Sequence, residues 1–75
     1  MKFYSIVIHN QRIVWHLQHD SWGDAFRTLL NYYKNTFNPD GYDTNEVINC
    51  FYNNNYVVED LDHDNSYTFE LLEVK

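Results

Sequence analysis

Alternating carboxylates near the C-terminus form the segment most suited to metal chemistry. Asp60, Asp62 and Asp64 alternate within the stretch EDLDHDNSYTFE, and Glu70 closes it. In an EF-hand loop, carboxylates at this spacing bind calcium from positions 1, 3 and 5. The loop also needs a glycine at position 6, a bidentate Glu at position 12 and a helix on each side. The segment therefore raises the choice between a calcium site and an acidic turn.

The register of this segment favours the turn. Counted from Asp60, position 6 is Asn65, which tolerates the left-handed conformation that glycine would supply. Glu70, however, falls at position 11 and Leu71 at position 12, so the bidentate ligand is out of register. The flanking residues alternate like strands rather than helices. We therefore predict a hairpin turn with acids on its rim, and no metal or other cofactor.

A second candidate for metal binding combines His16, His19 and Asp20 with Cys50. On a strand, residues three apart point to opposite faces, and structural zinc sites use closer pairs of Cys and His. We interpret the histidines as ordinary polar-face residues. Cys50 lies among apolar neighbours in the acidic half of the chain, which predicts a packed, unreactive thiol.

The sequence lacks the usual signatures of catalysis. The two glycines, Gly23 and Gly41, cannot form a glycine-rich phosphate loop. The serines stand in no nucleophile motif, and the carboxylates on the hairpin rim are expected to be solvated. We predict that the protein is not an enzyme.

Length and composition predict one globular domain over residues 1–75. Aromatic residues make up 19% of the chain, and each buried ring removes a large area from water, so a small core can pack efficiently. A single cysteine permits no intrachain disulfide, which is typical of a reducing compartment. The N-terminal run alternates and is too short for a signal peptide, and no apolar stretch could span a membrane. A cytoplasmic protein is expected.

Hydrophobic patterning predicts two strands, two helices and two further strands. Strands are expected over residues 2–9, 12–19, 56–61 and 67–74, with a tight turn at 10–11. The first helix should be capped by Asp20 or Ser21 and end before Pro39. The second should be capped by Asp43, with Glu46 reaching back, and end near residues 53–55.

The apolar positions of the two predicted helices specify one buried face on each. In the first helix these positions are Trp22, Phe26, Leu29, Tyr33 and Phe37, with Tyr32 pointing elsewhere. In the second helix they are Val47, Ile48 and Phe51. The order β-β-α-α-β-β predicts an α+β fold in which a four-stranded antiparallel sheet carries two helices on one face. The other face is left for solvent or for a docked partner.

Charge is divided unevenly between the two halves of the chain. Residues 1–37 carry four basic and two acidic side chains, whereas residues 38–75 carry one basic and nine acidic ones. The first half thus has a net charge of +2 and the second half −8. No basic cluster is present, so direct binding to a nucleic-acid backbone is not expected.

Acids and tyrosines of the second half form the predicted partner-binding set. Its members are Asp40, Tyr42, Asp43, Glu46, Tyr52, Tyr56, Glu59, Asp60, Asp62, Asp64, Tyr67 and Glu70. Alternate acids on a strand project their charges about 6–7 Å apart, so such a row could oppose lysines and arginines of another protein. The competing interpretation is that the acids only solvate the chain and protect an edge strand, while the tyrosines cover the rim of the core.

The segments EDLDHD, PDGYDTNE and NCFYNNNY give the chain a profile that resembles small acidic inhibitors encoded by bacteriophages, including anti-CRISPR and anti-restriction proteins. The resemblance is one of size, charge and composition. It implies an inhibitor that competes for a basic surface of a nuclease, polymerase or defence complex in the host cytoplasm. The charge density of this chain is lower than that of a full DNA mimic. The alternative function is a structural or assembly subunit that pairs, for example as a homodimer, through a sheet edge or the free sheet face.

Overall fold

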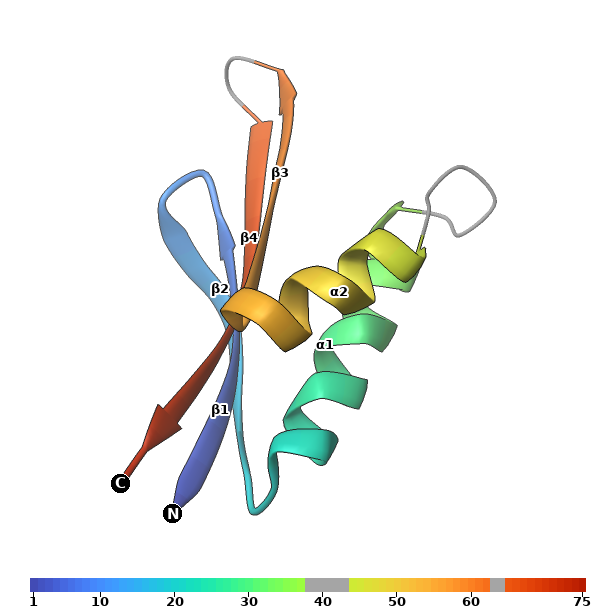
Figure 1. Cartoon of the computed structure of the whole chain (residues 1–75). Helices are drawn as coiled ribbons and strands as arrows, with labels where there is room; N and C mark the ends of the chain where they lie inside the picture. The colour runs from blue at the N-terminus through green and yellow to red at the C-terminus, as the bar shows by residue number, and fades with distance from the viewer. Residues whose placement is uncertain (38–43, 63–64) are drawn as a thin grey trace.

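The predicted order of elements is the order in the folded chain. The computed structural model describes residues 1–37, 44–62 and 65–75. The elements are β1 (Lys2–His9), β2 (Arg12–His19), α1 (Trp22–Phe37), α2 (Thr44–Asn54), β3 (Tyr56–Asp62) and β4 (Asn65–Val74) (Figure 1).

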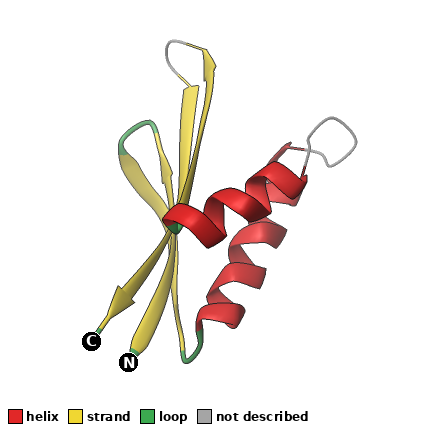
Figure 2. Ribbon diagram, viewed as in Figure 1, coloured by secondary structure: helices red, strands yellow, loops and turns green. Residues whose placement is uncertain are grey.

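The four strands form one antiparallel sheet in the order β2-β1-β4-β3. β1 and β4 are its central strands and pair from Lys2↔Val74 to His9↔Tyr67, while β2 and β3 form the two edges. Both helices lie on the same side of this sheet (Figure 2). The predicted α+β fold is therefore confirmed.

The β1–β2 turn shows how local sequence determines the hairpin. Asn10 and Gln11 have φ values of 52° and 69°, as the two central residues of a type I′ turn require. The backbone N–H of Asn10 donates to the Ser66 carbonyl at 3.0 Å, and the Asn10 side chain accepts from the Ser66 N–H at 2.9 Å. The turn predicted at residues 10–11 is thus confirmed and is attached to β4.

The acidic segment that resembles a calcium loop connects two strands. Asp62 at the end of β3 pairs with Asn65 at the start of β4, so the segment is flanked by strands, as its alternation predicted. Residues 63 and 64, which include Asp64, lie outside the described residues.

α1 begins with a serine cap and presents an aromatic face to the sheet. The hydroxyl of Ser21 accepts a hydrogen bond from the Asp24 backbone N–H at 3.1 Å, so Ser21 rather than Asp20 is the cap. Every predicted stripe position of α1 is buried or packed against the core. Tyr32 is also half-buried, with its ring 5.4 Å from that of Trp15, so the buried face is wider than the stripe predicted.

α2 buries Val47 and Phe51, as predicted, and leaves Ile48 half-buried. Asn55 follows the last residue of the helix, and its φ of 63° and N–H bond to the Phe51 carbonyl at 3.0 Å form a left-handed C-terminal cap. The N-terminal cap predicted at Asp43 and the turn around Pro39 lie outside the described residues.

Candidate functional site

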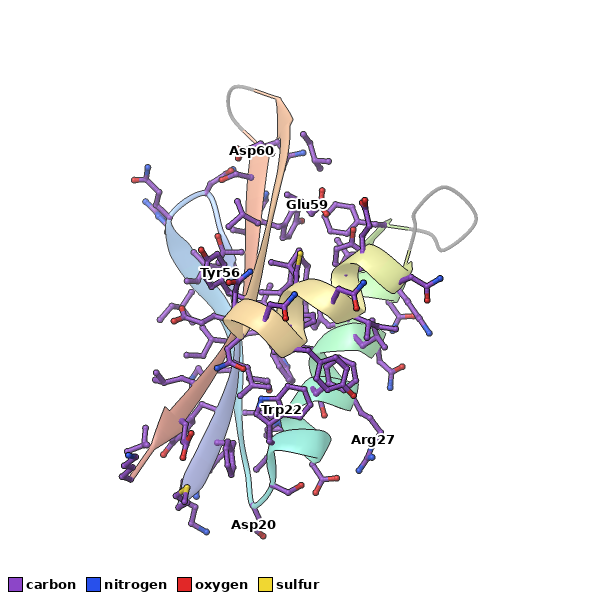
Figure 3. All side chains as sticks on the ribbon, viewed as in Figure 1. Asp20, Trp22, Arg27, Tyr56, Glu59 and Asp60 are labelled. Carbon is purple, nitrogen blue, oxygen red and sulfur yellow. The ribbon has the colours of Figure 1, made fainter. Side chains whose placement is uncertain are left out.

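Strand pairing separates the predicted acidic row onto two faces of the sheet. Glu59 points from β3 toward the helices, whereas Tyr56 and Asp60 lie on the opposite face (Figure 3). The β3–β4 register shifts between Asp60 and Asp62, which interrupts the regular spacing that the sequence suggested. The side chain of Asp62 is not described. The predicted residues therefore do not form one continuous charged row.

The remaining predicted residues are also dispersed. Tyr67 lies under the helices, where its ring stacks on His9 at a centroid distance of 4.2 Å. Glu70 occupies the face of the sheet that the helices leave open. Tyr52 is exposed on α2, and its ring lies 5.2 Å from that of Trp22. Asp40, Tyr42 and Asp43 lie outside the described residues.

A groove between α2 and the edge strand β3 is lined by several of the predicted partner-binding residues. We name it the α2–β3 groove; its volume is 310 Å³. It is lined by Tyr33, Glu46, Val47, Cys50, Asn54 and the strand residues 56–59. Three predicted partner-binding residues, Glu46, Tyr56 and Glu59, thus border one concave site.

The carboxylates of the groove are held differently. Glu59 is half-buried and accepts a hydrogen bond from the Tyr33 hydroxyl at 2.8 Å, which orients its carboxylate. Glu46 is exposed in the first turn of α2, where a negative charge interacts favourably with the helix dipole. Within the described chain, neither carboxylate forms an ion pair. The groove therefore carries a negative charge that no ion pair among the described residues neutralises.

The ion pairs of the described residues are found in the first half of the chain. They are Lys2–Asp20 at 2.8 Å and Arg27–Asp24. The hydrogen bond from Lys2 holds the pKa of Asp20 below its ordinary value of 3.8, and hydrogen bonds from Arg27 and then Ser21 lower the pKa of Asp24 in the same way. Lys2 and Arg27 are thus paired within the first half of the chain, whereas Arg12 and Lys34 form no ion pair among the described residues.

Asp24 gives a prediction with a defined pH dependence. Because its pKa is lower in the folded chain, its contribution to stability is present above its ordinary pKa of 3.8 and is lost as the pH falls through the folded value. Asp24→Asn should lower the melting temperature slightly at about pH 7, and this effect should shrink as the pH falls below 3.8 toward the lower folded pKa. Thermal melts at a series of pH values, followed by circular dichroism, test this. Asp60→Asn is the matched control and should leave the melting temperature unchanged across the series.

The structure also forms a Ser–His pair that sequence reasoning missed. The Ser5 hydroxyl lies 2.8 Å from His19 Nε2, an arrangement seen in nucleophilic catalysis. Ser5 is completely buried, so a substrate has no access to its oxygen. The pair follows from the Phe3↔His19 register, which places His19 under the helices, while the Ile6↔His16 pairing leaves His16 on the other face. The opposite orientation predicted for the two histidines is confirmed.

Cys50 is half-buried, packs against the core and lines the groove. Among residues 1–37, 44–62 and 65–75, no three or more His, Cys, Asp or Glu side chains are grouped to hold a metal ion. No helix of the described chain has the length and apolar character to cross a membrane.

Comparisons with known proteins leave the residues as the basis for functional inference. No family model, no curated protein and no solved structure matches the chain.

Proposed function

We propose that the protein is a non-enzymatic, inhibitor-type binding protein that captures a basic segment of a partner protein in the α2–β3 groove. The observation that carries this proposal is the pair of carboxylates, Glu46 and Glu59, bordering one groove without a described counter-ion. Lysine or arginine is the side chain that complements such a site, because charge-assisted hydrogen bonds to a carboxylate are among the strongest in proteins.

The edge position of β3 supplies a second means of recognition. An edge strand leaves half of its backbone N–H and C=O groups without a partner in the sheet. An extended segment can pair with such an edge and place alternate side chains toward one face. Basic residues at these alternate positions would reach Glu59, and a further one would reach Glu46 across the groove.

Basic segments are common where proteins hold nucleic-acid backbones. We therefore propose a nucleic-acid-handling or host-defence protein as the partner, in line with the resemblance to small acidic phage inhibitors. The net charge of −8 on residues 38–75 would accelerate association with such a surface and repel nucleic acid itself. The protein would then act by occupying a site that its partner uses for phosphate contacts.

The test is a tagged pull-down from bacterial lysate with the wild type and Glu46→Gln/Glu59→Gln. Glutamine at position 59 keeps an oxygen that can accept from the Tyr33 hydroxyl, so the fold is preserved while both charges are removed. The wild type should retain a stoichiometric partner at about 50 mM salt and lose most of it at about 200 mM, because ionic strength screens exposed charges.

Asp20→Asn/Glu73→Gln is the control, since it removes the same charge from exposed positions outside the groove. The control should retain the partner at low salt and the groove variant should not. Equal retention by the two variants, or no partner of the wild type at either salt, would contradict the proposed function.

A further inference from the structure

The face of the sheet opposite the helices is largely apolar. Ser5 and Val7 are buried under the helices, so strand alternation directs Tyr4, Ile6 and Ile8 to the other side. Pairing adds further residues to this side, which we name the open face: Ile13, His16, Gln18, Tyr56, Val58, Asp60, Thr68, Glu70, Leu72 and Val74. The exposed fraction is 62% for Ile13 and 42% for Leu72, so apolar surface remains in water.

One cross-strand row of the open face places an imidazole and a carboxylate on either side of an isoleucine. Ile6 on β1 pairs with His16 on β2 and with Glu70 on β4. Directly paired side chains share a face of the sheet, with Cβ atoms about 5 Å apart. The imidazole and the carboxylate therefore stand one strand to each side of Ile6.

We propose that the open face binds a second copy of this chain, with the two-fold axis running along β1. A rotation about this axis places β1 opposite β1 and β2 opposite β4 of the second copy. His16 then faces Glu70 of the second copy, and Glu70 faces its His16. Two imidazole–carboxylate pairs thus flank a centre in which Ile6 packs on Ile6 and Ile8 on Ile8. Sheets packed face to face in an aligned manner cross at about 30°. Residues near the two-fold axis are moved only slightly by this rotation, so the contacts between facing residues are kept.

The position of Glu70 favours a second copy of the chain over an apolar partner on the open face. Glu70 is half-buried in the middle of the open face, and its carboxylate forms no ion pair with a described residue. Covering it with an apolar surface would bury an uncompensated charge, which is strongly unfavourable. A second copy supplies the compensating imidazole at the matching position in the row.

The other titratable groups of the open face do not compete for this role. Lys2 at its end is paired with Asp20, and the Tyr4 hydroxyl donates to Gln18. Tyr56 and Asp60 lie on β3, which extends beyond the overlapped strands. The imidazole of His16 and the carboxylate of Glu70 are therefore the groups that face each other across the contact.

The overlapped area indicates a reversible dimer. Strands β2, β1 and β4 lie about 4.8 Å apart, and the eight residues of β1 at about 3.4 Å each give roughly 14 Å by 27 Å of sheet. Two copies would cover on the order of 800 Å² of projected area, at the low end for specific interfaces. β3 and the α2–β3 groove stay outside the contact, so the dimer does not depend on the proposed function and would present two grooves.

Sedimentation equilibrium between about 5 and 500 μM tests the dimer. The wild type should show a monomer–dimer equilibrium. His16→Glu places two carboxylates opposite each other and should weaken the dimer at least about tenfold. The swapped variant His16→Glu/Glu70→His should restore the affinity.

Circular dichroism confirms that each variant is folded before it is compared. A wild type that stays monomeric at the highest concentration would overturn the proposal. Dimers of equal strength for the wild type and His16→Glu, or a swapped variant as weak as the single one, would overturn the pairing of His16 with Glu70. Partner capture in the pull-down remains a separate readout, so the groove and the dimer can fail independently.

Discussion

Phe69→Ala is expected to lower the free energy of unfolding by about 3–5 kcal/mol, the range for truncation of a buried phenylalanine. Phe69 is completely buried on β4, and its ring centroid lies 5.2 Å from that of Tyr33 and 5.9 Å from that of Phe37. Truncation leaves a cavity beneath the C-terminal half of α1 and removes both edge-to-face contacts. A domain of this size is stabilised by only about 4–11 kcal/mol, so the loss is a large share of the total.

Urea unfolding followed by circular dichroism measures this effect. Val74→Ala on the same strand is the matched control, because Val74 is 44% exposed and its truncation leaves no enclosed cavity. The control should change the free energy by less than about 1 kcal/mol. A loss for Phe69→Ala as small as that of the control would show that the aromatic cluster is not the centre of stability.

Phe51→Ala is expected to detach α2 from the rest of the fold. Phe51 is completely buried and, with Val47, provides the fully buried surface of α2. Its ring lies edge-on to Phe26 at 5.8 Å, while Trp22 donates a hydrogen bond to Asn55 beside the end of the helix. Losing the buried ring costs about 3–5 kcal/mol, and an element held by few buried contacts can open locally.

Amide hydrogen exchange distinguishes local from global opening. In the Phe51→Ala variant, amides of α2 should lose protection while those of β1 and β4 keep most of theirs. The α2–β3 groove needs both of its walls, so capture of a partner should be lost as well. Tyr52→Ala, which truncates the neighbouring ring at 64% exposure, is the control and should leave α2 protected. Equal loss of protection in β1 and α2 would mean that the chain unfolds as one unit.

Local sequence patterns were sufficient to predict the secondary structure. Period-two alternation located the strands, and the spacing of Trp22, Phe26, Leu29 and Tyr33 located α1. Residues 10–11 were predictable as a turn because Asn adopts the left-handed region at low cost. Such signals are readable because each depends on residues that are neighbours in the chain.

The site required information that the sequence does not contain locally. The sequence identified Glu46, Tyr56 and Glu59 as acidic or interfacial residues, but it suggested one row of acids. Pairing of β3 with β4 turned Glu59 toward the helices and Asp60 away from them. The groove exists because α2 packs beside the edge strand that follows it.

By itself, the sequence determined the element types, the antiparallel α+β class and the concentration of charge in residues 38–75. Tertiary structure alone decided the strand order, the burial of the Ser5–His19 pair and the row that places His16 and Glu70 beside Ile6. The physical reason is that register between strands distant in sequence is set by the fit of buried side chains across the whole sheet. A shift of one residue would exchange the two faces of a strand and move every one of these groups.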